Sequence, residues 1–217
     1  MKKLNAIKHI ARKGMNDRRK SIEAYMNQLE HKSYDTYQHC LRVSRLARGF
    51  AAYLQLSPSE QAKLVQGCYL HDLGKLFIPD AILKHEGALT TEQWSIMRAH
   101  SMFGGMILDQ LFTSIDSSIY EVVVHHHEHW DGSGYPSNQN GEQIPYFARI
   151  CSIIDAFDSM ISDRCYRKGL SYEQCISELR KHSGKQFDPE LVERFIKFTN
   201  SAGYPLLPST PAYVSVL

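Results

Sequence analysis

A chain of 217 residues can bury a substantial core and fits one domain, or one domain with short appendages. Its 43% apolar and 22% charged residues are typical of a globular protein, and its net charge of +2 is too small to predict binding to a DNA or RNA duplex. The sequence has no apolar run as long as a membrane span and no secretory signal, so we expect a cytoplasmic protein.

The first predicted elements are helical. Residues 1–32 are predicted to form a helical extension that is basic and only weakly amphipathic at its start. A helix is predicted over residues 35–56, where apolar side chains recur at the 3.6-residue period. Asp35 and His39 lie four residues apart and share one face of this helix, which can therefore offer two ligands to one site. A lone histidine in such a helix is more often a packing residue, so the case for His39 as a ligand rests on the other candidate ligands.

The next predicted helix, residues 57–70, ends in the sequence HDLGK, residues 71–75. An imidazole nitrogen binds one divalent ion, whereas the two oxygens of a carboxylate can bridge two ions. The adjacent pair His71 and Asp72 therefore suits a binuclear centre. Lys75 would lie close enough for its ammonium group to meet a phosphate oxygen.

One long amphipathic helix is predicted over residues 90–112, with His100 in its middle. The helix that follows ends in three successive histidines, His125, His126 and His127. Successive helical residues point about 100° apart, so these three rings cannot all face one site. We expect two of them to be ligands and one to be a structural partner. The glycine-rich residues 131–142 are predicted to form an ordered loop beside the site, with a small ribbon as its only strand content.

A further helix over residues 145–161 places Asp155 among apolar side chains, with Asp158 three residues later on the same face. An unpaired carboxylate is costly to bury there, and metal ligation by Asp155 would remove that cost. The basic segment that follows contains Arg164 and Arg167 and suits phosphate contacts, although an exposed turn fits it equally well.

These candidates lie on or at the ends of helices, and neither strand alternation nor an internal repeat interrupts them. The sequence therefore predicts an all-α bundle whose helices aim ligands at a common centre, beside the glycine-rich loop. Nitrogen and oxygen ligands without sulfur favour iron, manganese or zinc over copper. The candidate ligands are Asp35, His39, His71, Asp72, His100, His126, His127 and Asp155.

The sequence strongly resembles the HD-GYP family of phosphodiesterases, a branch of the HD superfamily of metal-dependent phosphohydrolases. The matching segments are YDTYQHCLRVSRLA, HDLGKLFIPDAIL, MRAHSMFGG, HHEHWDGSGYP, ARICSIIDAFDSMISDRCYR and FDP, in the order of the family. The resemblance implies a catalytic domain over residues 33–200, between the helical extension of residues 1–32 and an irregular tail of residues 201–217.

The resemblance also implies roles for individual residues. Asp72 would bridge two divalent ions of iron or manganese, and His125 would not be a primary ligand. Members with three metals carry Glu at the position of Asp35, which is one methylene shorter, so a third ion depends on whether Asp35 reaches it. The metal ligands that the resemblance implies are His39, His71, Asp72, His100, His126, His127 and Asp155. The substrate contacts that it implies are Lys75, which would also neutralise charge during catalysis, Tyr135 of the GYP loop, and Arg164 and Arg167 at a second phosphate.

Members of this family open cyclic di-GMP to linear pGpG, and some continue to GMP, so the leading interpretation is a bacterial signalling phosphodiesterase. Mixed cyclic GMP-AMP is an alternative substrate, because the motifs specify the phosphodiester reaction better than the bases. The rival interpretations are a catalytically weak cyclic-dinucleotide receptor or interaction module, and a generic HD nucleotidase. A homodimer, a signalling partner protein and a place within a longer protein all stay open.

Overall fold

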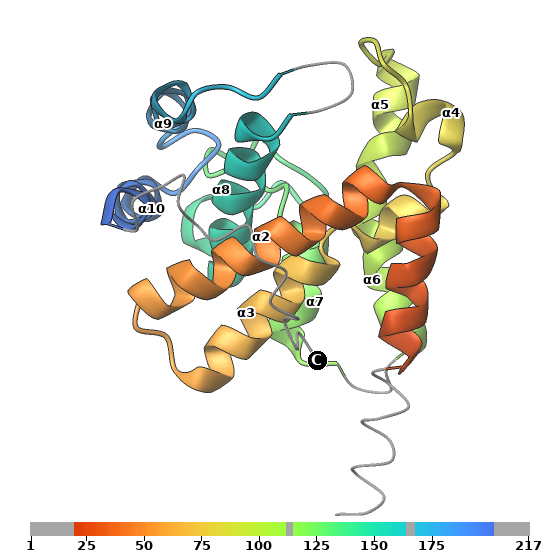
Figure 1. Cartoon of the computed structure of the whole chain (residues 1–217), viewed down its shortest axis with the longest axis horizontal. Helices are drawn as coiled ribbons and strands as arrows, with labels where there is room; N and C mark the ends of the chain where they lie inside the picture. Colours follow the sequence, from red (N-terminus) through yellow and green to blue (C-terminus); the bar gives the residue numbers. More distant parts are fainter. Residues whose placement is uncertain (1–19, 112–114, 164–167, 202–217) are drawn as a thin grey trace, which may run out of the picture.

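The computed structural model describes residues 20–111, 115–163 and 168–201. These ranges form a helical bundle without a strand, as predicted, and none of their helices combines the length and apolar character needed to cross a bilayer (Figure 1). After the helical residues 20–32, the elements are α2 (Tyr34–Tyr53), α3 (Pro58–Leu70), the 3-10 turn η1 (Leu73–Phe77), α4 (Asp80–Leu83), α5 (Thr91–Arg98), α6 (His100–Leu111), α7 (Ser117–His125), the 3-10 turn η2 (Gly141–Gln143), α8 (Tyr146–Ile161), α9 (Tyr172–Lys181) and α10 (Pro189–Ser201).

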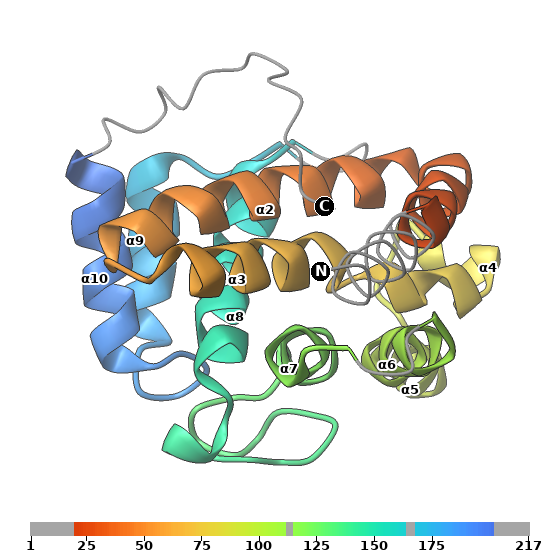
Figure 2. The ribbon, with the colours of Figure 1, turned by 90° about the horizontal axis from the view of Figure 1, so that it is seen from below.

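Helices α2 and α3 run side by side through the middle of the bundle (Figure 2). Helices α9 and α10 lie at one end of this pair, and α4, α5 and α6 lie at the other end (Figures 1 and 2). Helix α7 packs on α3, and α8 packs on α2. The two central helices therefore contact α7, α8 and α10 directly.

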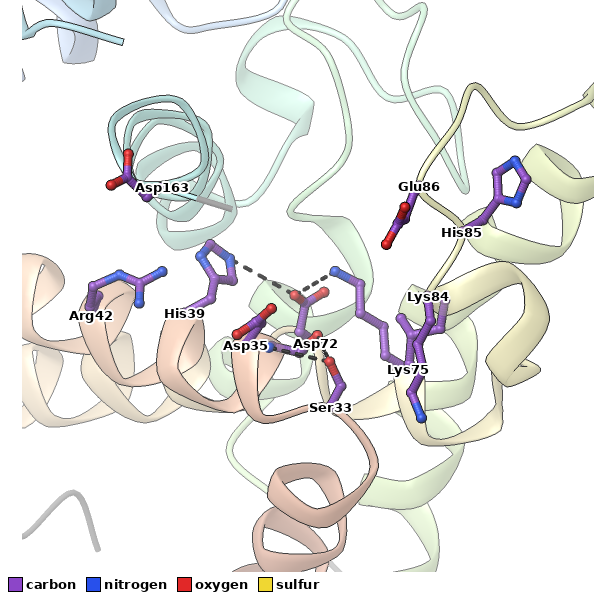
Figure 3. A pocket seen from close by; sticks show the side chains of 12 residues that line it. Ser33, Asp35, His39, Arg42, Asp72, Lys75, Lys84, His85, Glu86 and Asp163 are labelled. Carbon is purple, nitrogen blue, oxygen red and sulfur yellow. Dashed lines mark hydrogen bonds and ion pairs between the residues drawn. The ribbon is translucent and has the colours of Figure 1, made fainter. Parts of the chain in front are cut away.

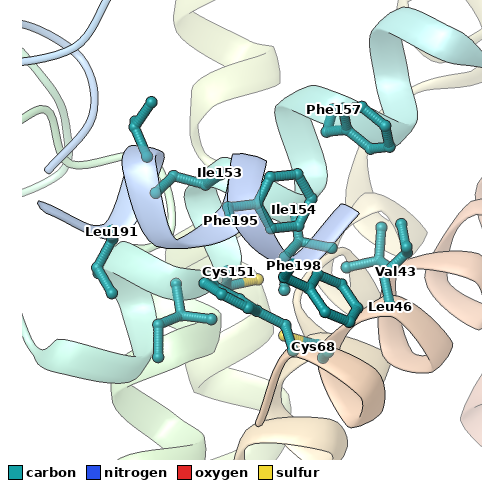
Figure 4. Packing of buried hydrophobic residues seen from close by; sticks show 14 of the residues in the cluster. Val43, Leu46, Cys68, Cys151, Ile153, Ile154, Phe157, Leu191, Phe195 and Phe198 are labelled. Carbon is teal, nitrogen blue, oxygen red and sulfur yellow. The ribbon is translucent and has the colours of Figure 1, made fainter. Parts of the chain in front are cut away.

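Two hydrophobic clusters hold these helices in place. The larger joins α2, α3 and α7–α10, and it includes the rings of Phe157 and Phe195, whose centroids lie 5.2 Å apart at an interplanar angle of 72° (Figure 4). The smaller cluster lies beneath the helical residues 20–32, where Met26 and Leu29 are buried. Each fully buried side chain of this size stabilises the fold by about 1.5–3 kcal/mol. The predicted extension thus contributes to a core of the described bundle.

The metal-ligand candidates of α2 and α3 lie where the two clusters meet. On α2, Cys40 belongs to the smaller cluster and Val43 to the larger one, immediately after His39. On α3, Cys68 belongs to the larger cluster and Leu70 to the smaller one, immediately before the pair at residues 71 and 72. Packing from both sides therefore fixes the backbone on which these candidates stand.

The prediction of one helix over residues 90–112 was wrong, because the chain turns at Ala99 between α5 and α6. Carbonyl oxygens at the end of α5 that lack a partner within the helix accept hydrogen bonds from side chains. Nδ1 of His100 donates to the carbonyl oxygen of Met97 at 2.7 Å. Helix α6 also packs directly on η1, since a Cβ on Gly74 would clash with the carbonyl oxygen of His100. His100 therefore begins a buried helix instead of lying in the middle of a long one.

The helix that carries the three successive histidines ends earlier than predicted. Helix α7 ends at His125, and His126 is its C-cap. The glycine-rich loop contains η2 and no strand in the part of the chain that the structure describes, so it lacks the ribbon that we considered. The prediction of α3 is confirmed, because Ser57 caps its first turn and forms a capping box with Glu60.

Candidate metal centre

Predicted ligands from separate segments of the chain meet in one cluster. Two groups of three side chains each place their ligand atoms within 4.8 Å of one another, and five of these six side chains are buried. The first group is His39, His71 and Asp72, and the second group is His100, His126 and His127.

Asp72 lies between the two groups. Its Oδ2 is 3.4 Å from Nε2 of His71 and 3.9 Å from Nε2 of His39. Its Oδ1 is 3.4 Å from Nε2 of His100, which belongs to the second group. Because each carboxylate oxygen faces a different group, Asp72 has the geometry expected of a ligand that bridges two ions.

Asp155 joins the first group from α8. Its Oδ1 lies 2.9 Å from Nε2 of His39 and 3.9 Å from Nε2 of His71. The carboxylate that the sequence placed among apolar residues therefore has charged and polar partners, which offset the cost of its burial.

Hydrogen bonds decide which nitrogen of three buried histidines faces the centre. In His71, His100 and His126, Nδ1 donates to the carbonyl oxygen three residues earlier, at 2.7, 2.7 and 3.0 Å respectively. A neutral ring with its proton on Nδ1 carries a lone pair on Nε2. All three rings thus present unprotonated nitrogens to the centre.

These lone pairs fit a cation. The Nε2 atoms of His100 and His126 are 3.3 Å apart, and neither has a proton to donate to the other. Nε2 of His71 is buried without a hydrogen-bond partner in the described residues and faces the carboxylate of Asp72. Such an arrangement is unfavourable by itself and becomes favourable when divalent ions lie among the lone pairs. The donor set therefore fits metal ions with nitrogen and oxygen ligands.

The charge states of the second group and of Asp72 suit ligation. Burial lowers the pKa of His100 to about 4 and the pKa of His127 to about 3, so both rings are neutral near pH 7. Burial opposes ionisation of Asp72, but the ammonium group of Lys75 together with His71 and His100 outweighs burial and holds the pKa of that carboxyl well below its usual range. Neutral imidazole and ionised carboxylate are the forms that bind metals.

Asp158 supports the centre, although sequence reasoning did not assign it a role. Its Oδ2 accepts a hydrogen bond from Nδ1 of His39 at 2.7 Å, while Nε and Nη2 of Arg42 donate to the same carboxylate at 2.9 Å. A carboxylate on the outer nitrogen of a ligating histidine fixes the ring and raises its basicity. The signal in the sequence was the three-residue spacing of Asp155 and Asp158, which gave no indication that His39 lies between them.

The same two carboxylates predict a pH dependence for the metal-free protein. Burial would lower the pKa of His39, but hydrogen bonds to Asp155 and Asp158 raise it to about 9, from 6.5 in the unfolded chain. Because the pKa of His39 is raised in the folded state, protonated His39 stabilises the folded protein. This stabilisation is fully present below pH 6.5 and is lost as the pH rises through 9. We expect the free energy of unfolding of chelator-treated protein, measured with urea, to fall by about 3 kcal/mol across this window. The His39→Gln variant should show a much shallower fall, and an equally steep one would place the titration elsewhere.

A pocket of about 310 Å³ lies beside the first group (Figure 3). His39, Asp72 and Lys75 form part of its wall, and Nζ of Lys75 donates to Oδ2 of Asp72 at 2.7 Å. Arg42 and Lys84 supply further cations at the wall. Cations next to the ligand cluster suit an anionic group such as a phosphodiester.

The structure places the remaining predicted residues as follows. Asp35 is exposed and lines the pocket, but it belongs to neither group of three. Tyr135 does not line this pocket, and its ring stacks on that of His127. Arg164 and Arg167, the predicted contacts to a second phosphate, lie outside the described residues.

The buried carboxylate of Glu128 organises the glycine-rich loop. Its two oxygens accept hydrogen bonds from the backbone N–H groups of Ser137, at 2.6 Å, and Gln139, at 3.1 Å. Nδ1 of His125 lies 3.6 Å from the same carboxylate, so this histidine faces the loop, in line with a structural role. Gly134 packs so closely on the backbone of residues 128 and 129 that a Cβ there would clash. The loop is therefore tied to the segment that carries the second group of ligands.

Comparisons with known proteins agree with this geometry. The family model described as HD domain matches residues 13–191. A Vibrio cholerae protein named 3'3'-cGAMP-specific phosphodiesterase 2 is 36% identical over 171 residues, which cover 79% of this chain and 33% of the relative. A Thermotoga maritima protein named cyclic di-GMP phosphodiesterase is 36% identical over 168 residues, which cover 77% of this chain and 46% of the relative. The chain thus spans less than half the length of these curated relatives.

A solved structure supports the fold. A Bdellovibrio bacteriovorus protein described as an HDG"Y"P protein aligns with a TM-score of 0.62 at 20% identity. The alignment covers 76% of this chain and 52% of the other. At this identity the likeness concerns the arrangement of helices and not the activity.

Proposed function

Because the chain belongs to the HD domain family and carries the motifs of its HD-GYP branch, we propose that it is a metal-dependent phosphodiesterase that hydrolyses cyclic di-GMP to linear pGpG. Its membership of the family confirms the resemblance drawn from the motifs. Ring opening adds one water across one of the two phosphodiester bonds. Onward hydrolysis to GMP would repeat the reaction on the linear product.

The observation that carries this proposal is the position of Asp72 between two groups of metal-ligand side chains, at the wall of a pocket with cations. Bound divalent ions would supply Lewis acidity that lowers the pKa of water and offsets charge on the phosphoryl oxygens. Lys75 is held by Asp72 at the pocket wall, where its ammonium group can donate to a phosphate oxygen as negative charge develops. Asp158 holds the orientation of the His39 ring through its hydrogen bond with Nδ1, and Arg42 holds Asp158 in place.

We propose two ions of iron or manganese, because the ligands are nitrogen and oxygen atoms without sulfur. His39, His71, Asp72 and Asp155 would hold one ion, and Asp72 would share the second with the group of residues 100, 126 and 127. Asp35 faces the pocket next to the first group, and it would serve a third ion only by reaching further than it does in the described geometry. We also propose that residues 33–200 form the catalytic domain, with packing support from residues 20–32.

Mixed cyclic GMP-AMP is a second candidate substrate. Relatives named for cyclic di-GMP and for 3'3'-cGAMP share the same 36% identity with this chain. The two compounds have the same phosphodiester ring and differ in one base, so the metal centre treats them alike. Selection between them must come from the pocket wall.

The experiment that tests the proposal uses protein purified without oxygen and loaded separately with Fe(II) or Mn(II). We expect conversion of cyclic di-GMP to pGpG, followed by chromatography, with cyclic GMP-AMP assayed in parallel for its kcat/KM. A higher kcat/KM for cyclic GMP-AMP would correct only the substrate. Tight binding of both compounds without turnover under Fe(II), Mn(II) and Zn(II) would favour a receptor and contradict the proposal.

A further inference from the structure

His127 differs from the other candidate histidine ligands in how its ring is held. In the other four, Nδ1 donates a hydrogen bond, to the carboxylate of Asp158 in one case and to a backbone carbonyl oxygen in the other three. His127 makes no side-chain hydrogen bond to any residue within the described ranges. A ligating imidazole usually needs such a partner, because it fixes the orientation of the ring before the metal binds.

An aromatic ring stacks on the face of the His127 imidazole. The ring of Tyr135 lies on that of His127 with centroids 4.9 Å apart and an interplanar angle of 29°. On its own ring Tyr135 also carries the guanidinium of Arg98, whose Cζ lies 5.4 Å from the ring centroid. His100 and His126 contact the His127 ring as well, at centroid distances of 4.9 and 4.0 Å. The imidazole is thus packed between aromatic rings.

The loop holds Tyr135 rigidly enough to act as such a support. Its backbone N–H donates to the carbonyl oxygen of His127 at 3.1 Å, which folds the loop back onto the ligand. The carbonyl oxygen of Gly134 accepts a hydrogen bond from Nδ2 of Asn138 at 2.6 Å. The carboxylate of Glu128 fixes the residues that follow. Each of these contacts is local to the GYP segment, so the segment presents the tyrosine ring to His127 at a fixed distance.

We propose that Tyr135, backed by Arg98, is a positioning residue that holds His127 in its metal-ligating orientation through its ring. Stacking of this kind contributes through dispersion and ring electrostatics, and the guanidinium of Arg98 over the Tyr135 ring adds a cation–π contact. Tyr135 does not line the pocket beside the first group, and its ring lies on a member of the second group. The inference rests on the proposed metal-dependent phosphodiesterase, but it concerns metal affinity, which is measured without substrate.

The test compares Tyr135→Leu with Tyr135→Phe. We expect Tyr135→Leu to weaken Mn(II) affinity, measured by competition with a chelator, by about 10-fold or more. It should also lower kcat for cyclic di-GMP while leaving KM within about twofold. Tyr135→Phe keeps the ring and removes only the hydroxyl, so its Mn(II) affinity and kcat should stay close to those of the unmodified protein. Arg98→Met keeps Tyr135 and removes its backing, and we expect a smaller loss of Mn(II) affinity from it.

A matched control exists on α8. Arg149 lies over the ring of Tyr146 at the same 5.4 Å, away from both groups of ligands, so Tyr146→Leu should leave Mn(II) affinity unchanged. Unchanged Mn(II) affinity in Tyr135→Leu combined with a raised KM would overturn the proposal and make Tyr135 a substrate contact. Equal defects in Tyr135→Phe and Tyr135→Leu would assign the role to the hydroxyl and overturn it too. If Tyr135→Leu does not fold, the Mn(II) affinities of Arg98→Met and Tyr135→Phe test the proposal. A loss in Arg98→Met with an unchanged affinity in Tyr135→Phe would support it, and any other result would overturn it. Absence of turnover in unmodified protein that binds Mn(II) would refute the proposed function alone.

Discussion

Asp72→Asn should abolish turnover of cyclic di-GMP and strip the protein of its metal. The carboxylate faces both groups of ligands, through Oδ2 to His71 and through Oδ1 to His100. An amide keeps the shape but replaces one charged oxygen with a donor, which would point at an unprotonated imidazole nitrogen or at an ion. Loss of a single preorganised electrostatic group already costs about 10²–10³ in kcat, so the loss here should exceed about 10³-fold. Metal content after desalting and product formation measure the two effects.

The control for this variant is Glu190→Gln, a surface carboxylate paired with Arg194 on α10 at the far end of the bundle. It should retain metal and turnover, since exposed pairs contribute little. The partly exposed ammonium group of Lys75 loses its partner in Asp72→Asn, so the thermal midpoint must be compared as well. A folded Asp72→Asn protein that keeps both ions would show that this residue does not bridge them.

Lys75→Met should lower kcat by about 10²–10³-fold while the protein keeps its metal. The ammonium group lies 2.7 Å from Asp72 and reaches the pocket wall, where a phosphate oxygen would approach (Figure 3). Its removal leaves the ligands in place and takes away one positive charge, so binding of divalent cations should not weaken. The combination of low kcat and full metal content distinguishes this variant from Asp72→Asn.

Two comparisons sharpen this prediction. Lys75→Arg retains the charge but changes its geometry, and it should recover part of the lost activity. Lys84 also lines the pocket but pairs with Asp80 instead of a candidate ligand. Lys84→Met should therefore reduce kcat far less than Lys75→Met. Equal losses in the two variants would mean that the pocket needs only its total charge, and that Lys75 has no special role.

The sequence by itself determined the fold class and identified the candidate site residues. The 3.6-residue period and the Ser57 cap located helices such as α2 and α3, because both depend on neighbours in the chain. The order of the histidine and aspartate motifs was sufficient to predict an HD-GYP phosphohydrolase. It also identified all six side chains of the two groups, Asp72 included, and their ligation remains a prediction.

The tertiary structure decided how those side chains are oriented, because orientation depends on contacts between segments far apart in the chain. Asp158 reaches His39 across 119 positions, and only the packing of α8 on α2 brings them together. The close approach of η1 to α6 placed His100 at the start of a helix, which periodicity could not indicate. The resemblance implied a substrate contact for Tyr135, whereas in the fold the ring of Tyr135 stacks on His127. Local sequence thus specifies the candidate ligands, whereas long-range packing selects the atoms that they present to the centre.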